Sequence, residues 1–443
     1  MAGKKKSDIF AAVGAATGLG NAFRFPALCV SYGAVFILAY AAALALVCFP
    51  LLCAELDLGR RIGLGGGGKR ARIWSGVMRA AAANSALIGL YYGVICQKLG
   101  SASLSFAISG DLSAGGNADV AVSVAVLLTV AVFALLNKGK RALSVTGKAS
   151  VFLSLAMFLC LAVAGAARGN GFLSFEVGKL AGGAIWVDAL GQALLALSLA
   201  AGVMPDYARG RGADFSPVKT ALAVTAFNFI GCVLATFATL PFVAVFPRTV
   251  GINCALEVYP QVIFAVAGGG FVARILGFFL FAVLALVGVQ SLCSLALPAV
   301  DRVAPLFKRG RPSAALLFCA AALISAPVFL YDGLQPLAAL DRMACSVNAV
   351  FIALAECAFC ASLRHIRGVT GFFMRFLCLP ACCFLAVVSL CSARFGCFAP
   401  LSLFCACAGA FFVLSAPFLP LFIRTVKRIF AKSRNLSPSR RRF

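Results

Sequence analysis

The chain has 443 residues, of which 62% are hydrophobic and 12% are charged. Soluble globular proteins carry about a quarter charged residues, so this composition excludes that class. The formal net charge of +25 does not call for a nucleic-acid partner, because the basic residues stand between long apolar stretches.

Apolar stretches follow one another along almost the whole sequence, separated by charged or glycine- and proline-rich segments. Roughly 20 apolar residues cross the hydrocarbon core of a bilayer. The stretches predicted to do so are 8–30, 33–56, 77–108, 118–136, 146–167, 185–207, 218–246, 271–300, 314–331, 338–362, 372–392 and 398–423. Segment 251–270, which holds Tyr259, Pro260 and three consecutive glycines, is predicted to be a re-entrant or surface-packed loop. The sequence thus predicts an all-α integral membrane protein with about twelve transmembrane helices.

The positions of the basic residues predict the orientation of these spans. If both termini face the cytoplasm, most of the 39 lysine and arginine residues fall on the cytoplasmic side, which is the positive-inside pattern. The N-terminus has no small-residue cleavage site, so no cleaved signal peptide is expected. Nearly all of the 19 cysteines lie within apolar runs, where thiols pack as small hydrophobes. Unpaired thiols and short termini favour a multi-pass protein of a bacterial inner membrane.

The first predicted span contains a glycine-rich break between Gly14 and Pro26. Irregular backbone is tolerated inside a bilayer only where protein or a water-filled cavity covers the freed groups. Unwinding here would point carbonyl oxygens at a cation and would leave the positive end of the next half-helix facing an anion. Arg24 adds a charge that costs about 2.5–3.5 kcal/mol at mid-membrane on insertion scales. Such a cost indicates a functional role.

The sixth predicted span contains a second interruption. Gly191 and Gln192 lead into the polar and small residues from Leu197 to Gly202. Close helix packing is the alternative explanation for glycines within a span. Two interrupted spans at corresponding positions of two five-span halves are, however, the sequence signature of an inverted-repeat transporter. The pair of breaks favours the transporter interpretation.

The first break resembles the first-span signature of the neurotransmitter:sodium symporter family. The nine residues from Gly18 to Pro26 carry the resemblance. Supporting positions run along nearly the whole chain, namely Tyr40, Glu55, Gly59, Arg60, Tyr91, Tyr92, Lys138, Gly139, Gly191, Gln192, Ser198, Asn228, Tyr259, Pro260, Gly288, Ser291, Pro298, Asp341 and Glu356. The resemblance implies a LeuT-like 5+5 inverted repeat in which helices 1 and 6 are broken. The expected divisions are repeats over 1–167 and 168–366, the last two spans over 367–424, and a basic cytoplasmic tail over 425–443.

The resemblance also implies which residues bind an amino acid. The carboxylate would be held by main-chain amides around Leu19 and Gly20 and by the hydroxyl of Tyr92, which donates without bringing a full charge. The residues expected to form the substrate site are Ala16, Leu19, Gly20, Ile88, Tyr92, Leu195, Ser198, Ala201, Ser291 and Leu295. Leu195 and Ala201 replace bulky aromatics of the family's bacterial pattern, so a larger apolar pocket is expected. A pocket without an acid or base disfavours a charged side chain, which predicts a neutral, bulky hydrophobic or aromatic amino acid.

Two sodium sites are implied in the same way. The first would combine the substrate carboxylate with the carbonyl oxygens of Ala16 and Ala196 and the side chains of Asn21 and Asn228. The second would use the carbonyl oxygens of Gly14, Thr17 and Val287 and the side chains of Gln290 and Ser291. Ala196 replaces a residue that contributes a hydroxyl in the family, so the first site lacks one oxygen. One or two Na+ ions are therefore expected.

The anion site and the gates follow the family pattern only in part. The anion site resembles Tyr40 and Gln192, but Cys232 and Ala196 stand where oxygen-bearing side chains are expected, so chloride coupling is doubtful. Arg24 and Asp341 are expected to form the outer gate, with a static ion pair as the alternative. The family's inner gate uses an N-terminal arginine and tryptophan, where this chain offers only Lys4 to Lys6 and Asp8. The sequence names no inner gate.

These features predict a sodium-coupled symporter that imports its amino acid by alternating access, with spans 1, 2, 6 and 7 rocking against the rest. Ala196 and Lys98 motivate one alternative, a proton-coupled or sodium-independent carrier. A transport-incompetent amino-acid sensor is another. An enzyme is not expected, because His365, the single histidine, lies in a basic turn and no span combines a nucleophile, a base and an orienting acid. The oligomeric state is not predicted.

Overall fold

The computed structural model describes residues 9, 12–16, 18–62, 69–166, 173–209, 211–212, 214–240, 253–330, 335–363 and 368–392. Within this part of the chain every regular element is helical, which confirms the predicted all-α class. The described helices that are long and apolar enough to cross a membrane are Val35–Arg61, Ala118–Lys138, Ala142–Gly165, Pro217–Thr239, Gly270–Leu306, Arg311–Val328, Pro336–Ala361 and Gly371–Ser389. The chain is a multi-pass membrane protein.

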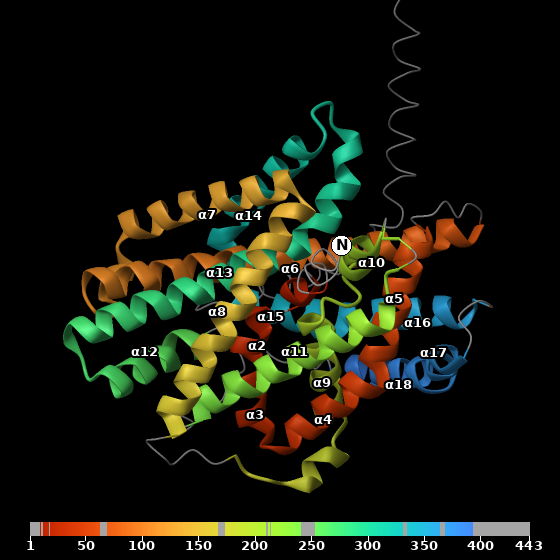
Figure 1. Ribbon diagram of the computed structural model, residues 1–443, viewed down its shortest axis with the longest axis horizontal. Helices are drawn as coiled ribbons and strands as arrows, with labels where there is room; N and C mark the ends of the chain where they lie inside the picture. Colours follow the sequence, from red (N-terminus) through yellow and green to blue (C-terminus); the bar gives the residue numbers. More distant parts are fainter. Residues whose placement is uncertain are drawn as a thin grey trace, which may run out of the picture.

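Two long helices, α6 (Lys69–Ile108) and α13 (Gly270–Val303), pack along each other through the middle of the molecule (Figure 1). Helices α7 (Ala118–Lys138) and α14 (Arg311–Leu330) lie together on one side of this pair. Helices α8 (Lys140–Ala166) and α11 (Pro217–Thr239) contact each other, and α8 also contacts α13.

Shorter helices occupy the rest of the bundle. They are α2 (Leu19–Ala22), α3 (Arg24–Tyr32), α4 (Val35–Ala43), α5 (Phe49–Ile62), α9 (Gly183–Ala196), α10 (Val203–Ala208), α12 (Asn253–Ala267), α15 (Gln335–Asp341), α16 (Ala349–Ala361), α17 (Gly368–Phe373) and α18 (Leu379–Ser392). Three π-helical stretches connect successive α-helices without a break. They are η1 (Leu44–Cys48) between α4 and α5, η7 (Arg342–Asn348) between α15 and α16, and η8 (Met374–Cys378) between α17 and α18. Three short 3₁₀ turns, η2 (Ser113–Gly116), η3 (Val177–Ala181) and η5 (Ala304–Leu306), lie at connections.

The distribution of polar residues is that of a membrane protein with a polar interior. Large apolar side chains such as Leu127, Phe271 and Ile324 are 69%, 76% and 78% exposed. Fully buried polar side chains include Glu55 and Asn228. Lipid is an apolar solvent, so the exposed apolar faces are stable there, whereas buried polar groups need partners inside the bundle.

The first and sixth spans are both discontinuous, as the sequence predicts. The first helical turn covers residues 12–16, Gly18 is extended (φ −131°, ψ −177°), and α2 begins at Leu19. In the sixth span α9 ends at Ala196 and α10 begins at Val203. Between them Ser198, Ala200 and Gly202 have left-handed φ angles of 52°, 53° and 73°. Each of the two spans is therefore interrupted by a short stretch of non-helical backbone partway along its length.

Segment 251–270 differs from its prediction. Residues Asn253–Ala267 form helix α12, with Pro260 inside it, so the expectation of a loop is wrong for these residues. A helix of 15 residues is roughly 22 Å long, too short to cross a core of about 30 Å, so the exclusion of a spanning segment is consistent with its length. Gly268 and Gly269 connect α12 to α13, which begins at Gly270, and all three glycines have positive φ.

The twelfth predicted span, 398–423, and the tail over 425–443 lie outside the described residues. The division into two repeats at residue 167 stays a prediction. The Gly-rich segment before α6 also falls outside the described part.

Gly14 lies where the first span packs closely against α8. A Cβ atom on Gly14 would lie 2.6 Å from the backbone carbonyl carbon of Gly147 on α8, so here the explanation is close helix packing. We expect Gly14→Ala to lower the free energy of unfolding by about 1–3 kcal/mol, the usual cost of overpacking, and to lower the midpoint of thermal unfolding. Gly178→Ala is the matched control, because no atom lies within 4 Å of its added Cβ. Equal midpoints for the two variants would contradict the packing role.

Candidate functional site

Hydrogen bonds join the two broken spans directly. Ser198 Oγ, in the sixth-span break, donates to the carbonyl oxygen of Ala15 at 2.9 Å. Gln192 Nε2, on α9, donates to the carbonyl oxygen of Gly20 at 3.1 Å. Carbonyl oxygens around the first-span break are thus partly satisfied by side chains of the sixth span. The breaks form one polar centre within an apolar bundle.

The sixth-span break is held in place by α5. Left-handed backbone at Ser198 and Ala200 costs on the order of 1–3 kcal/mol each unless the surroundings impose it. The Oε1 atom of the fully buried Glu55 accepts from the backbone N–H of Ala200 at 3.0 Å. The carboxyl group of Glu356, on α16, lies against that of Glu55. The two buried acids thus connect α5 with α16 and with the sixth-span break.

Three oxygen atoms converge on the side chain of Asn228, on α11. Its Nδ2 atom lies 3.2 Å from the Ala16 carbonyl oxygen, 3.1 Å from the Ala196 carbonyl oxygen and 3.4 Å from Asn21 Oδ1. Its Oδ1 atom accepts from the hydroxyl of Tyr40 at 2.7 Å. The structure therefore brings together all four residues that the sequence predicts for the first sodium site.

The chemistry of this cluster fits a hard cation. An amide nitrogen carries two protons, so the Asn228 Nδ2 cannot donate fully to three oxygens at once. A half-turn of the amide would place a fourth oxygen beside the other three, and the Tyr40 hydroxyl could then accept instead of donate. Four uncharged oxygens suit an ion that prefers oxygen ligands. Asn21 Nδ2 is buried without a hydrogen-bond partner, beside a cavity of about 10 Å³ that Gly18 and Gly231 help to line.

The second predicted sodium site is brought together only in part. Ser291 Oγ, on α13, is buried without a hydrogen-bond partner and lies 2.7 Å from where a Cβ atom on Gly18 would be. Val287 is one turn earlier on α13 and is also buried. Thr17 lies outside the described residues. The orphaned hydroxyl beside the extended backbone at Gly18 is the feature that fits an ion.

Gln290 is placed differently from its expected role. Its Oε1 atom accepts from Thr146 Oγ1 at 2.5 Å and its Nε2 atom donates to the Leu143 carbonyl oxygen at 3.0 Å. Adjacent residues on an α-helix point about 100° apart, so Gln290 faces α8 while Ser291 faces the first span. A role for the Gln290 side chain as a sodium ligand would require it to leave both bonds.

The predicted substrate residues lie on the elements around the two breaks. Leu19 and Gly20 begin α2, Leu195 is near the end of α9, and the described elements that complete the set are α6, the sixth-span break and α13. Leu195 Cδ2 is 3.5 Å from where a Cβ on Gly20 would be. The buried members of the set are Ala16, Leu19, Gly20, Ile88, Tyr92, Ser198, Ala201, Ser291 and Leu295. Only Leu195 is half-buried.

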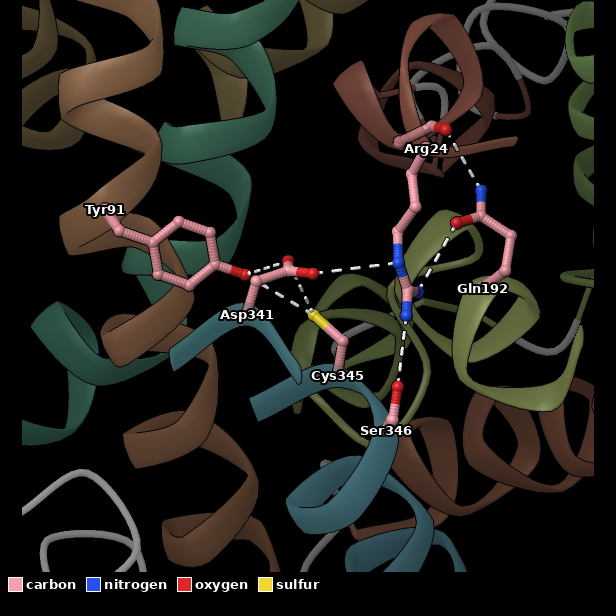
Figure 2. Close-up of polar contacts among 7 residues, drawn as sticks. Arg24, Tyr91, Gln192, Asp341, Cys345 and Ser346 are labelled. Carbon is pink, nitrogen blue, oxygen red and sulfur yellow. Dashed lines mark hydrogen bonds and ion pairs between the residues drawn. The ribbon is translucent and has the colours of Figure 1, made fainter. Parts of the chain in front are cut away.

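A polar network covers one side of this centre, and Figure 2 shows it around Arg24. Arg24 Nε lies 3.7 Å from Asp341 Oδ2, and its Nη2 atom donates to Ser346 Oγ at 3.1 Å. Its Nη1 atom donates to Gln192 Oε1 at 3.5 Å. Tyr91 donates to Asp341 Oδ1 at 2.8 Å. The structure thus brings together the two residues predicted as the outer gate.

Sequence reasoning missed several polar contacts in and around this network. Ser346 belongs to the π-helical stretch η7, whose wider turn changes which side chains face Arg24. Tyr32 donates to Asp188 Oδ2 at 2.7 Å and so joins α3 to α9. Tyr259, on α12, donates to the Ala22 carbonyl oxygen at 2.9 Å, and its ring packs edge-on against Phe23. The resemblance included Tyr259, but no sequence signal gave its contact.

The residues that resemble the anion site are engaged elsewhere. Tyr40 donates to Asn228, and its hydroxyl lies 3.6 Å from Cys232 Sγ. Gln192 contacts Gly20 and Arg24. A thiol is a weak hydrogen-bonding group, so these contacts give no support to chloride coupling.

The N-terminal part of the chain is similar to known families and proteins. Residues 2–108 match the family model described as "Sodium:neurotransmitter symporter family". The chain is 36% identical over 95 residues to the "Sodium- and chloride-dependent GABA transporter ine" of Drosophila melanogaster, a match that covers 20% of this chain and 10% of that protein. It is 38% identical over 95 residues to the "Inactive sodium-dependent neutral amino acid transporter B(0)AT3" of Homo sapiens, covering 20% and 15%. The matched segment thus spans only a small part of these relatives' length.

The structural comparison extends over most of the chain. The solved structure titled "Crystal structure of MhsT in complex with L-phenylalanine" matches with a TM-score of 0.74 at 21% identity, covering 86% of this chain and 98% of that one. At this level of identity the match shows the fold. The family model that matches residues 2–108 describes symporters, which are transporters rather than enzymes. Residues 2–108 are thus similar to the sodium:neurotransmitter symporter family, and most of the chain has the fold of the MhsT structure.

Proposed function

We propose that the chain is a sodium-coupled symporter that imports a neutral, bulky hydrophobic or aromatic amino acid by alternating access. The observation that carries this proposal is the convergence of the Ala16 and Ala196 carbonyl oxygens and Asn21 Oδ1 on Asn228, between the two breaks. Similar proteins are named as sodium-dependent transporters, and the MhsT structure is a complex with L-phenylalanine.

One or two Na+ ions would bind at the breaks. The first would be held by Ala16, Asn21, Ala196 and Asn228 together with the substrate carboxylate. The second would use the orphaned Ser291 hydroxyl, with carbonyl oxygens of the first span and of Val287. Each sodium that enters down the membrane potential contributes about 2.3 kcal/mol per 100 mV, which is sufficient to concentrate an amino acid.

The substrate would lie beside the first ion. Gly18 provides no side-chain cap for α2, so the amides around Leu19 and Gly20 are suited to a carboxylate, and the Tyr92 hydroxyl would donate to it. The side chain of the substrate would face Ile88 and Leu295, which are apolar and buried. The absence of a charged group among the predicted pocket residues disfavours acidic and basic amino acids.

Arg24 and Asp341 would form the outer gate above this site. Their pair is partly buried, with 12% and 28% of the two side chains exposed.

The proposed location is a bacterial inner membrane with both termini in the cytoplasm, which places most basic residues on the inner side. No chloride is included in the proposal.

Two alternatives lead to different measurements. The first alternative is a proton-coupled or sodium-independent carrier, which an inward-facing Lys98 would favour. The Lys98 side chain is exposed on α6, so its position does not support this alternative. A sensor that binds without transporting is the second alternative, and one similar human protein is named inactive. Binding of an amino acid without flux would identify a sensor.

Ligand-induced thermal stabilisation of the purified protein tests the binding half of the proposal. With Na+ present, we expect phenylalanine, tyrosine, tryptophan or leucine to raise the unfolding midpoint by several degrees, since ligand at 100 times its Kd adds about 2.7 kcal/mol. Glycine, glutamate and lysine should have little effect, and choline in place of Na+ should remove the shift. A preference for glycine, glutamate or lysine would contradict the proposed substrate class, and an equal shift in choline would contradict sodium coupling.

A further inference from the structure

A second ion pair lies on the side of the sixth-span break opposite to Arg24 and Asp341. Asp206, on α10, is 7% exposed, and its Oδ2 atom accepts from Arg302 Nη1 at 2.8 Å. Arg302 is in the last turn of α13, and the same nitrogen donates to the Pro298 carbonyl oxygen at 2.7 Å. Arg209 Nη2 lies 3.3 Å from Asp206 Oδ1. The pair therefore ties the helix that follows the break to the end of α13.

The Arg302 side chain lies against the sixth-span break. The Arg302 Nη2 atom is 3.5 Å from where a Cβ atom on Gly202 would lie, and Gly202 follows Ala201, a predicted substrate residue. Along α13, Arg302 is eleven residues beyond Ser291, or about 16 Å at 1.5 Å per residue. Its guanidinium group thus reaches back under the site from one end of the bundle.

The two helices that this ion pair connects, α10 and α13, differ in length and in how they join the rest of the bundle. Helix α10 has six residues and is connected to α9 through the left-handed residues Ser198, Ala200 and Gly202, which is a short segment able to absorb a change of angle. Helix α13 has 34 residues and belongs to the central pair of helices. Helix α10 also packs closely against α5, where a Cβ atom on Gly59 would collide with the backbone of Pro205. Opening of the contact with α13 would therefore move α10 and α5 together.

The sequence names no inner-gate residues for this chain. The N-terminal tail offers lysines in place of the expected arginine and tryptophan, and residues 1–8 lie outside the described part. Asp206 and Arg302 supply an opposite-charge contact from within the described helices.

We infer that the Asp206–Arg302 ion pair is the inner gate of this transporter, the cytoplasmic counterpart of Arg24–Asp341. This inference rests on the proposed transport function. In alternating access, the substrate leaves to the cytoplasm only when α10 separates from the end of α13, and the gate closes again when Asp206 accepts from Arg302. Arg209 keeps Asp206 paired with a cation while the gate is open.

Hydrogen–deuterium exchange of the full chain in lipid nanodiscs, with Na+ and phenylalanine, tests this inference. In Asp206→Asn and in Arg302→Gln we expect amides 203–208 to exchange about tenfold faster or more, because removing one partner of a close charge pair commonly costs 0.5–3 kcal/mol of coupling. The double variant should exchange no faster than either single variant, since both lose the same contact. Asp206→Glu keeps the charge and should stay within about threefold of the wild type.

Two controls separate a gate from a general loss of structure. Glu176→Gln breaks the exposed Lys179–Glu176 pair, 3.0 Å long, and should leave exchange at 203–208 unchanged. Exchange in α7 should be unchanged in every variant, which shows that the bundle is folded. Wild-type exchange at 203–208 in either single variant would overturn the inference.

Uptake of phenylalanine into proteoliposomes distinguishes this inference from the proposed function. Both single variants should transport at least about tenfold more slowly than the wild type, while Glu176→Gln transports normally. Normal uptake in both single variants would overturn the gate. If the wild type itself shows neither sodium-dependent uptake nor binding, the proposed function fails, and the exchange data still report whether the contact holds α10 closed.

Discussion

Replacing Asn228 by alanine is expected to lower the apparent affinity for Na+ by about 100-fold or more, since the loss of even outer partners of a metal site costs 10–100-fold. The substitution removes the group on which the Ala16 and Ala196 carbonyl oxygens and Asn21 Oδ1 converge. Amino-acid binding should fall with it, because the substrate carboxylate would share the ion. Sodium titration of phenylalanine binding measures the effect.

Asn228→Asp separates a ligand role from a structural one. Aspartate offers oxygen atoms but no N–H, so it should retain sodium-dependent binding if Asn228 acts as a ligand. If Asn228 serves only to donate to the surrounding oxygens, aspartate should be at least as damaging as alanine. Asn84→Ala is the matched control, since Asn84 is equally buried but donates to the Ala344 carbonyl oxygen between α6 and η7. That control should lose stability and keep its sodium affinity.

Removing the charge of Arg24 should reduce uptake at least about tenfold. Arg24→Gln leaves Asp341 without its cation and removes the contact with Ser346. Breaking a fully buried pair costs about 3–5 kcal/mol, and the partial exposure of Asp341 reduces that cost. A tenfold loss corresponds to about 1.4 kcal/mol, well within this range. Initial rates of sodium-driven uptake measure it.

Arg24→Lys tests the geometry of the same gate. Lysine keeps the charge but cannot reproduce the planar fork that reaches Asp341, Ser346 and Gln192 together. Its uptake should lie between those of the wild type and Arg24→Gln. Normal uptake in Arg24→Gln would indicate that the pair is a static contact, the alternative left open by the sequence.

Both broken helices were predictable because small residues interrupt otherwise apolar spans. Gly18 lies where the first helix breaks, and Leu197 to Gly202 fill the gap in the sixth. Backbone freed inside a bilayer must be covered, so the pattern carries structural meaning on its own. Not every glycine of the first span marks the break, because Gly14 packs closely against Gly147 on α8.

Helix α12 shows where local signals mislead. Pro260 and the glycines at 268–270 predict a loop, but helix α12 tolerates the proline, and the turn before α13 lies at Gly268 and Gly269. Tertiary contacts with α13 and the bond from Tyr259 to Ala22 hold this helix in place. The bond from Tyr259 to Ala22 joins residues 237 positions apart, and no local pattern reports it.

The side-chain partners within the site were the least predictable feature. Gln290 and Ser291 are neighbours in sequence, yet only Ser291 faces the first-span break. Ser346 reaches Arg24 through a π-helical turn that has no sequence signature. Asp206 and Arg302 are 96 residues apart and become partners only because α10 folds against α13. The sequence thus indicates which residues lie near the two breaks, whereas the orientation of their side chains depends on the packed bundle.

Accumulation of phenylalanine in proteoliposomes under an inward Na+ gradient tests the central claim most directly. The account predicts accumulation above the external concentration, an increase when the interior is made negative, and its loss when choline replaces Na+. Equal accumulation in choline and in sodium, or saturable sodium-dependent binding with no flux, would contradict it.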